Sequence, residues 1–349
     1  MSPLPSEEEL LTRLKAVFST RRRDVLLGIG DDAAVVLDGG RLVVTTDVLV
    51  EGEDFLADTD PGRLGRKTLS VSLSDLAAMG ATPLYATLTL GLRRESEASW
   101  VEQFAQGLKS VAVEHGVAVV GGDLSASPVI FASVTALGRA PDSGAITRSG
   151  ARAGDEIYVS GTLGASAAGL ALLRLGYRLG PDGAGSRVRG KRPVGSKVPE
   201  MARLLRHHVD PRPLVELGRA LADPSLASAA IDMSDGLARD LHRLCRSSGV
   251  GANLEAEALP VDSALHDLES LTRLDPDEAA LFGGEDFGLL FTVDPGKAKS
   301  LARLTRRFAL RRIGTVTDAR SGVKIVTGGR ADPLPDTGFD HFGKQGSCP

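Results

Sequence analysis

The sequence is poor in cysteine and has no long apolar run. Only two cysteines, Cys245 and Cys348, occur among 349 residues, which excludes a disulfide scaffold or a zinc ribbon and fits a reducing compartment. No apolar run approaches the roughly 18 residues of a membrane-spanning helix. The first residues are acidic and amphipathic, unlike a secretory signal, which is basic and then apolar. We therefore expect a cytoplasmic protein that does not bind membranes.

Strong charge and histidine motifs are also missing. The net charge of −4 gives no indication of nucleic-acid binding. The six histidines show neither the spacing of a metal site nor that of a catalytic triad. The Gly-x-Ser-x-Gly elbow of serine hydrolases does not occur. These absences leave the acidic residues as the main candidates for chemistry.

What remains is the composition of a soluble globular protein, with 42% hydrophobic and 25% charged residues. The length suggests two domains. Residues 138–154 are rich in Gly, Pro, Ser and Arg and make a plausible boundary. We predict an N-terminal domain over residues 1–140, a C-terminal domain over 150–342 and a tail over 343–349.

Periodicity predicts alternating helices and strands, and hence an α/β (α+β) fold. The first half contains both hairpin and crossover connections. The predicted helices cover residues 6–18, 60–79, 97–115, 213–221, 236–247 and 276–282, and an Ala-rich helix is predicted after Gly164. The predicted strands cover residues 34–37, 41–46, 84–91, a buried strand at 117–120, 129–137, 156–160, 229–233, 287–293 and 311–316. We predict a mobile basic loop over residues 176–196 and a loop-like tail from Thr327 onward.

Acidic residues recur at the ends of the apolar runs. The first are Asp31 and Asp32, which follow Gly28-Ile29-Gly30. Adjacent carboxylates repel unless cations or hydrogen-bond donors surround them. The later acids stand beside Gly, Ser or Thr, and they are Asp47, Asp75, Asp123, Asp232 and Asp235. We expect these acids to meet around metal-bound phosphate.

Mg²⁺ prefers oxygen ligands and binds through one or two carboxylates together with substrate phosphates. Seven acids exceed the requirement of one ion, so we expect two or more ions, which would supply the charge neutralisation that phosphoryl transfer needs. Arg148 is the best candidate for a phosphate clamp, and Glu285 and Asp286 could reach a substrate hydroxyl or amine. The alternatives are that Asp235 only caps a helix, that Arg148 is a surface residue, and that Gly283–Asp286 is a helix end with solvated acids.

Taken together, these motifs resemble the thiamine-monophosphate kinases, which belong to the aminoimidazole-ribonucleotide-synthetase-like superfamily. The matching segments span almost the whole chain in family order: 28–33, 45–51, 71–80, 120–123, 147–154, 159–169, 231–237, 281–287 and 340–342. The resemblance implies ATP-dependent phosphorylation of thiamine monophosphate by direct transfer, with several Mg²⁺ ions and no catalytic nucleophile. It also implies a homodimer built through N-terminal mixed sheets, with an α/β C-terminal domain that closes over the active site.

The resemblance also assigns roles to residues. Magnesium would be held by Asp32, Thr45, Thr46, Asp47, Asp75, Asp123, Asp232 and Asp235. ATP would be held by Gly122, Asp123, Arg148 and Ser234. The thiamine moiety would contact Glu285 and Phe339, and also Asp54, which replaces the histidine usual at that position. Asp336-Thr337-Gly338-Phe339 departs from a family pattern that often carries Trp, so both departures concern the acceptor.

Other functions stay open at this point. One is another ATP-using enzyme of the superfamily, such as an aminoimidazole-ribonucleotide synthetase. A selenophosphate synthetase would need a reactive N-terminal cysteine, which is absent, and a carbamoyl dehydratase would need its cysteine last, whereas Pro349 follows Cys348. A non-catalytic module that senses ATP or divalent ions is the alternative outside the enzymes.

Overall fold

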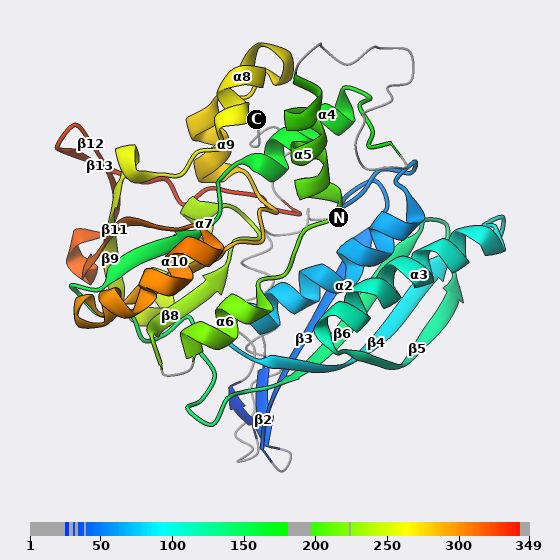
Figure 1. The fold of residues 1–349 in the computed structure, drawn as a ribbon, viewed down its shortest axis with the longest axis horizontal. Coiled ribbons are helices and arrows are strands. Elements are labelled where there is room, and N and C mark those ends of the chain that lie inside the picture. Colours follow the sequence, from blue (N-terminus) through cyan, green and yellow to red (C-terminus); the bar gives the residue numbers. More distant parts are fainter. Residues whose placement is uncertain are drawn as a thin grey trace, which may run out of the picture. The chain divides into compact units, whose positions relative to one another are not determined.

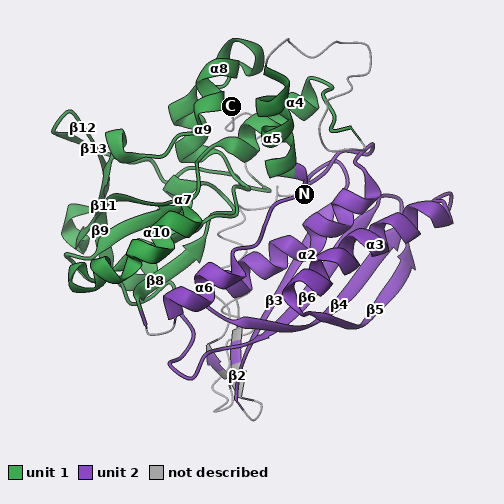
Figure 2. Ribbon diagram, viewed as in Figure 1, with its two compact units in different colours: residues 1–19, 148–208, 226–349 green, residues 20–147, 209–225 purple. Residues whose placement is uncertain are grey.

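The computed structural model describes residues 25–27, 31, 34–37, 40–180, 197–222 and 225–342. The predicted helix at 6–18, Asp32 with the glycines before it, most of the 176–196 loop, and Cys348 lie outside these residues. The chain divides into two compact units, each described by itself (Figure 2). Unit 2 comprises Thr20–Thr147 and Val209–Ser225, and unit 1 comprises Met1–Ser19, Arg148–His208 and Leu226–Pro349. Both mix helix and sheet, as predicted, and within the described part no helix is long and apolar enough to span a membrane.

Unit 2 is a six-stranded mixed sheet in the order β1-β2-β3-β6-β4-β5. Its strands are β1 (Val25–Leu27), β2 (Ala34–Leu37), β3 (Arg41–Val50), β4 (Thr82–Leu92), β5 (Ala118–Ala126) and β6 (Phe131–Arg139). Only the β4–β5 pair is parallel, and its crossover contains α3 (Ala98–His115). The predicted hairpin and crossover connections are therefore both confirmed.

One face of this sheet is covered by α3 and by α2 (Pro61–Ala78) (Figure 1). Helix α2 begins as predicted, since the Asp60 side chain accepts from the backbone N–H of Arg63 at 2.9 Å and Pro61 occupies the first helical position. Trp100, Phe104 and Leu108 recur at helical spacing along α3, and this stripe packs in the core, with Phe104 fully buried and stacked on Trp100. A third helix of the unit, α6 (Val215–Ala222), packs on α2.

The prediction of a buried strand at residues 117–120 is wrong in two respects. The strand is not buried and does not end before Gly121, because β5 continues to Ala126 and is exposed along its whole length. It lies at the sheet edge and pairs only with β4, so Val120 is 61% and Leu124 67% exposed. A continuous apolar run indicates burial only when both faces of the strand are covered.

Unit 1 is a seven-stranded sheet in the order β13-β12-β9-β11-β7-β10-β8. Its strands are β7 (Glu156–Ser160), β8 (Ala227–Asp232), β9 (Val250–Glu255), β10 (Leu289–Val293), β11 (Leu310–Asp318), β12 (Val323–Thr327) and β13 (Arg330–Pro333). Its α-helices are α4 (Ala165–Arg174), α5 (Val198–Val209), α7 (Leu237–Ser248), α8 (Ser263–Thr272), α9 (Pro276–Phe282) and α10 (Ala302–Phe308). Short 3₁₀ helices occur at Ala256–Ala258, Pro295–Leu301 and Ala319–Ser321.

The core of unit 1 lies between β7, β8, β10 and β11 and the apolar stripe of α7. Cys245 is 2% exposed in this core, and burial raises the pKa of its thiol to about 12. The prediction of a loop-like chain from Thr327 is wrong at its start, because β12 and β13 form a hairpin there, whereas residues 334–342 form neither helix nor strand. Gly328 and Gly329 make its turn with φ of 56° and 83°, which suits glycine.

Candidate functional site

In unit 2 the candidate residues begin with a threonine–aspartate pair. Thr45 lies on β3 and is 7% exposed, and its hydroxyl donates a hydrogen bond to the Asp75 carboxylate on α2. Asp47 lies two residues further along β3, on the same face, and its Oδ2 is buried. This face of β3 also carries the buried Val43 and Leu49. Thr45, Asp47 and Asp75 therefore form an oxygen-rich group where α2 lies against β3.

Strand alternation separates two other candidates from this group. Thr46 points to the opposite face, where its hydroxyl accepts a hydrogen bond from Thr135 at 3.1 Å. Asp123 pairs across the sheet with Thr89, and Thr89 pairs with Ser133 on β6. Ser133 pairs in turn with Val48, which shares the face of Thr46, so Asp123 also lies on the face of Thr46. The structure therefore does not bring the side chains of Thr46 and Asp123 to Thr45.

Gly122 has a packing reason independent of any ligand. A Cβ atom at this position would lie 1.8 Å from the carbonyl oxygen of Leu88. Only glycine allows β5 to approach β4 so closely.

Asp54 closes the turn that follows β3. Its Oδ2 accepts a hydrogen bond from the backbone N–H of Val50 at 2.8 Å, and its own N–H donates to the Val50 carbonyl at 2.9 Å. Gly52, with φ of 91°, allows the chain to reverse there. One carboxylate oxygen of Asp54 is thus engaged by the turn that positions it.

In unit 1 the candidates gather on the loop between β8 and α7. Asp232 ends β8 and is 3% exposed. After Asp232, backbone hydrogen bonds hold two other segments against this loop. The backbone N–H of Glu285 donates to the Ser234 carbonyl at 2.7 Å, and that of Phe339 donates to the Asp235 carbonyl at 3.0 Å. These bonds bring together four of the predicted residues: Ser234, Asp235, Glu285 and Phe339.

Two glycines make this convergence possible. A Cβ atom on Gly284 would lie 2.8 Å from the Ser234 carbonyl oxygen, and one on Gly338 would lie 2.3 Å from the Asp235 carbonyl oxygen. Three chain segments therefore pack backbone against backbone around Asp235.

Helix α7 supplies charged partners that the sequence analysis missed. Arg243 forms an ion pair with Asp235, and its Nη1 also lies 3.1 Å from Asp240 Oδ1. The backbone N–H of Asp235 donates to Asp240 Oδ2 at 3.1 Å. Helix α7 begins after Gly236 without a side-chain cap, so the Asp235 carboxylate is paired with Arg243 rather than used as a cap. The available signal was an acid at position 240, inside the apolar stripe of Leu237, Leu241 and Leu244.

Arg148 lies near the same group. Its carbonyl accepts a hydrogen bond from the Ser248 hydroxyl at 2.8 Å, and that hydroxyl in turn accepts from Gly150 and Ala151. Burial raises the pKa of Asp240, and the positive charge of Arg148 is one of the smaller opposing influences. Arg148, Arg243, Asp235 and Asp240 therefore interact within one region of unit 1.

Burial raises the pKa of Asp240 from 3.8 to about 7, and the charge of Asp235 acts in the same direction. The folded chain then keeps a proton that the unfolded chain releases, so stability falls as pH rises from about 4 to 7, by on the order of 1 kcal/mol for each pH unit. Asp240→Asn is expected to remove this part of the pH dependence in thermal melting. Asp336→Asn, at an exposed acid paired with Arg246 on the same helix, should keep the wild-type slope. An unchanged slope in Asp240→Asn would contradict the assignment.

Gly283 ends helix α9, but Asp286, which follows it, is not a solvated acid. Asp286 is 8% exposed, and its carboxylate accepts hydrogen bonds from Gly164 N–H at 2.6 Å and Ser166 N–H at 2.9 Å. Burial raises the pKa of this carboxyl. Glu285 and Phe287 adopt positive φ values of 63° and 48°, a strained backbone that often occurs at functional sites.

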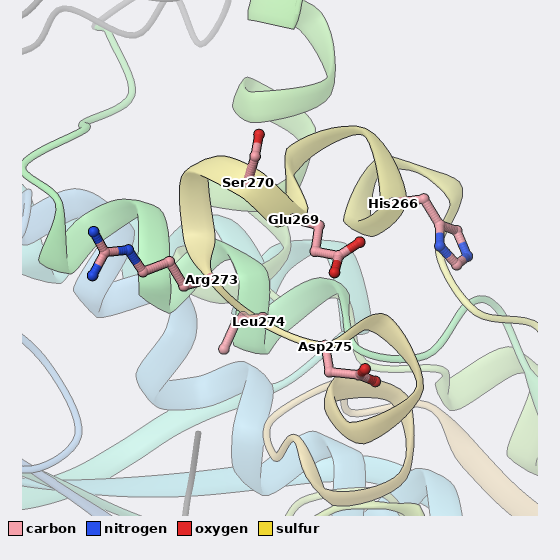
Figure 3. Close-up of a pocket in the computed structure, with 6 residues that line it drawn as sticks. All are labelled: His266, Glu269, Ser270, Arg273, Leu274 and Asp275. Carbon is pink, nitrogen blue, oxygen red and sulfur yellow. The ribbon is translucent and has the colours of Figure 1, made fainter.

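A cavity of about 440 Å³ lies elsewhere in unit 1, at the α8–α9 connection (Figure 3). Figure 3 shows side chains that do not converge on one point, with Arg273 directed away from His266. The lining residues are His266, Glu269, Ser270, Arg273, Leu274 and Asp275. None of them belongs to the candidate site.

The donor groups fit magnesium only in part. In the described part of the chain, no three His, Cys, Asp or Glu side chains are grouped so that they could hold a metal ion by themselves. Mg²⁺ commonly takes one or two carboxylates and completes its shell with waters and substrate phosphates. The hydroxyl–carboxylate group at Thr45 and the acids at 232 and 235 match that chemistry, and Asp32 lies outside the described residues.

Comparisons with known proteins agree with this picture. Residues 30–140 match the N-terminal domain, and residues 152–326 the C-terminal domain, of AIR synthase related proteins. Two domains of mixed helix and sheet with oxygen-rich acidic groups therefore define a member of that class. The thiamine-monophosphate kinase of Escherichia coli K12 is 37% identical, over 96% of this chain and 98% of its own length. The chain belongs to the thiamine-monophosphate kinase family.

Solved structures show the same relationship. A structure described as AaThiL complexed with AMPPCP and TMP has a TM-score of 0.81 and 32% identity, over 96% of this chain and 97% of its own. The thiamine-monophosphate kinase of Stenotrophomonas maltophilia has a TM-score of 0.73 and 37% identity, over 93% of this chain and 96% of its own.

Proposed function

We propose that this protein transfers the γ-phosphoryl group of ATP to thiamine monophosphate and forms thiamine diphosphate and ADP. The observation that carries the proposal is the family relationship, 37% identity over 96% of the chain. The loop that gathers Ser234, Asp235, Glu285 and Phe339 supports it, because it unites residues proposed for phosphate with residues proposed for the thiamine moiety.

The reaction is a direct in-line transfer. An oxygen of the acceptor phosphate forms a bond to the γ-phosphorus, and the bond from that phosphorus to the bridging oxygen of ADP breaks. Magnesium, when bound, neutralises phosphate charge and orients the reacting groups. No side chain needs to become phosphorylated in such a transfer.

The chain supplies binding and orientation. Magnesium would be held by Asp32, Thr45, Asp47, Asp75, Asp232 and Asp235. Arg148 and Ser234 contact ATP phosphates, and Gly122 and Asp123, on the exposed β5, are proposed for ATP as well. Glu285 and Phe339 receive the thiamine moiety, and Asp54 contributes its carboxylate beside the turn that fixes it.

The test is ADP release when thiamine monophosphate, Mg²⁺ and ATP are mixed with the protein. ADP that forms only when all three are present supports the kinase. Binding of ATP without release of ADP would support a sensing module. Formation of aminoimidazole ribonucleotide from its formyl precursor, with no ADP from thiamine monophosphate, would support the related synthetase.

We also propose that the protein is a homodimer, joined through the exposed part of the unit 2 sheet. The support is an edge strand whose Val119, Val120 and Leu124 are 44%, 61% and 67% exposed, beside Tyr85 at 47%. Apolar exposure of this kind on a sheet edge favours pairing with another chain.

The cytoplasm remains the proposed location, because the low cysteine count fits a reducing compartment.

Sedimentation of the wild-type protein is expected to give twice the 36.4 kDa of one chain. Leu124→Glu, which places a charge on this surface, should give the mass of one chain. Arg94→Glu, at an exposed polar site of the same unit, should stay dimeric. A wild-type protein with the mass of one chain would contradict the proposal.

A further inference from the structure

A buried histidine contacts one of the residues proposed for the acceptor. His208 lies near the end of α5 and is 4% exposed. Its Nδ1 is 2.9 Å from the Ser166 hydroxyl on α4 and 3.3 Å from Glu285 Oε2. The close approach of α4 to α5 depends on Gly169, where a Cβ atom would lie 2.3 Å from the Leu204 carbonyl oxygen. Helix packing therefore determines where the imidazole stands.

Glu285 has a fixed backbone and a partly open side chain. Its N–H donates to the Ser234 carbonyl at 2.7 Å, and the following residue, Asp286, is anchored to the first turn of α4. With the main chain held in this way, only the side-chain torsions of Glu285 can vary. The side chain is 27% exposed, so a ligand can still reach it.

In the contact between His208 and Glu285, the imidazole must be the hydrogen-bond donor. A carboxylate oxygen can only accept a hydrogen bond, so Nδ1 of His208 must carry a proton for its contact with Glu285 to be attractive. The Ser166 hydroxyl can accept from the same N–H. One oxygen of Glu285 is then held by His208, while the side chain as a whole stays 27% exposed to a ligand.

We propose that His208 is a positioning residue, which holds the Glu285 carboxylate in the orientation that binds the thiamine moiety of the acceptor. The inference rests on the proposed function, because Glu285 is proposed there as an acceptor contact. A glutamate that is ordered before binding loses less side-chain entropy when the ligand arrives. Loss of His208 should therefore weaken acceptor binding and leave ATP binding unchanged.

The experiment compares His208→Gln with His208→Asn in steady-state ADP release. The amide nitrogen of Asn reaches the position of Nδ1, whereas that of Gln reaches the position of Nε2. His208→Gln is expected to raise the KM for thiamine monophosphate about tenfold, with the KM for ATP within about twofold of wild type. His208→Asn should restore most of the wild-type KM. His207→Asn is the matched control, because His207 faces Asp286 at 3.9 Å rather than Glu285, and it should leave both KM values unchanged.

A second set of measurements keeps the inference testable if His208→Gln does not fold. Ser166→Ala removes the competing partner of Nδ1 and should leave the KM for thiamine monophosphate unchanged or lower it. Glu285→Gln should raise that KM, and adding His208→Asn to it should have no further effect.

The inference is overturned if both KM values rise together in His208→Gln, if His208→Asn fails to rescue, or if Ser166→Ala raises the acceptor KM. Wild-type protein that releases no ADP from thiamine monophosphate contradicts the proposed function instead. The two failures are therefore distinguishable.

Discussion

Asp235→Asn is expected to lower turnover by at least about 100-fold, because removing one charge-stabilising group at a phosphoryl-transfer site costs about 10²–10³ in rate. The variant removes a negative charge that pairs with Arg243 and that is proposed to hold magnesium. Asparagine keeps the shape of aspartate and one oxygen that can accept from Arg243. The free energy of unfolding should therefore stay near the wild-type value.

Steady-state ADP release and thermal melting measure the two halves of this prediction. Asp336→Asn is the control, because Asp336 is also an aspartate paired with an arginine of α7, at an exposed position that is not proposed as a ligand. Its turnover should remain within about twofold of wild type. Near-normal turnover in Asp235→Asn would contradict the proposal that Asp235 holds magnesium.

Gly218→Ala should destabilise the protein by about 2–3 kcal/mol, which is typical when an atom is forced into a well-packed contact. Gly218 lies on α6 where this helix crosses α2, and a Cβ atom there would lie 1.9 Å from the Ala77 carbonyl oxygen. The direction of the effect is informative. In an open helix position the same change would stabilise the protein by about 1 kcal/mol, because alanine is the better helix former.

Chemical denaturation of the variant measures this difference. Arg219→Ala on the same helix changes an exposed side chain to alanine and should alter the free energy of unfolding by less than about 0.5 kcal/mol. A Gly218→Ala variant that is more stable than wild type would show that α6 does not pack closely on α2.

Local chemistry allowed several elements to be predicted from the sequence. Asp60 and Pro61 define the start of α2, because a capping carboxylate and a proline act within one turn of the chain. The helical stripe of α3 and the strand Glu156–Ser160 follow from periodicity, which depends only on residues nearby.

Other features depended on partners distant in the sequence. The apolar run of β5 does not reveal that this strand lies at a sheet edge, since that depends on which strands pair with it. Similarly, Asp240 is buried because α7 packs on the sheet, and Arg243 faces Asp235 only because the loop before α7 turns back. The hairpin of β12 and β13 needed the parallel pairing of β12 with β9 to become part of the sheet.

The same division applies to the candidate site. The sequence by itself determined which residue types are available: acids beside Gly, Ser or Thr at the ends of apolar runs. Strand alternation then decided, in the tertiary structure, that Thr45 faces Asp75 whereas Thr46 does not. Packing of α4 against α5 placed His208 beside Glu285, although 77 residues of sequence separate the two. Motifs are local and survive in a one-dimensional pattern, but which side chains meet depends on long-range pairing and helix packing.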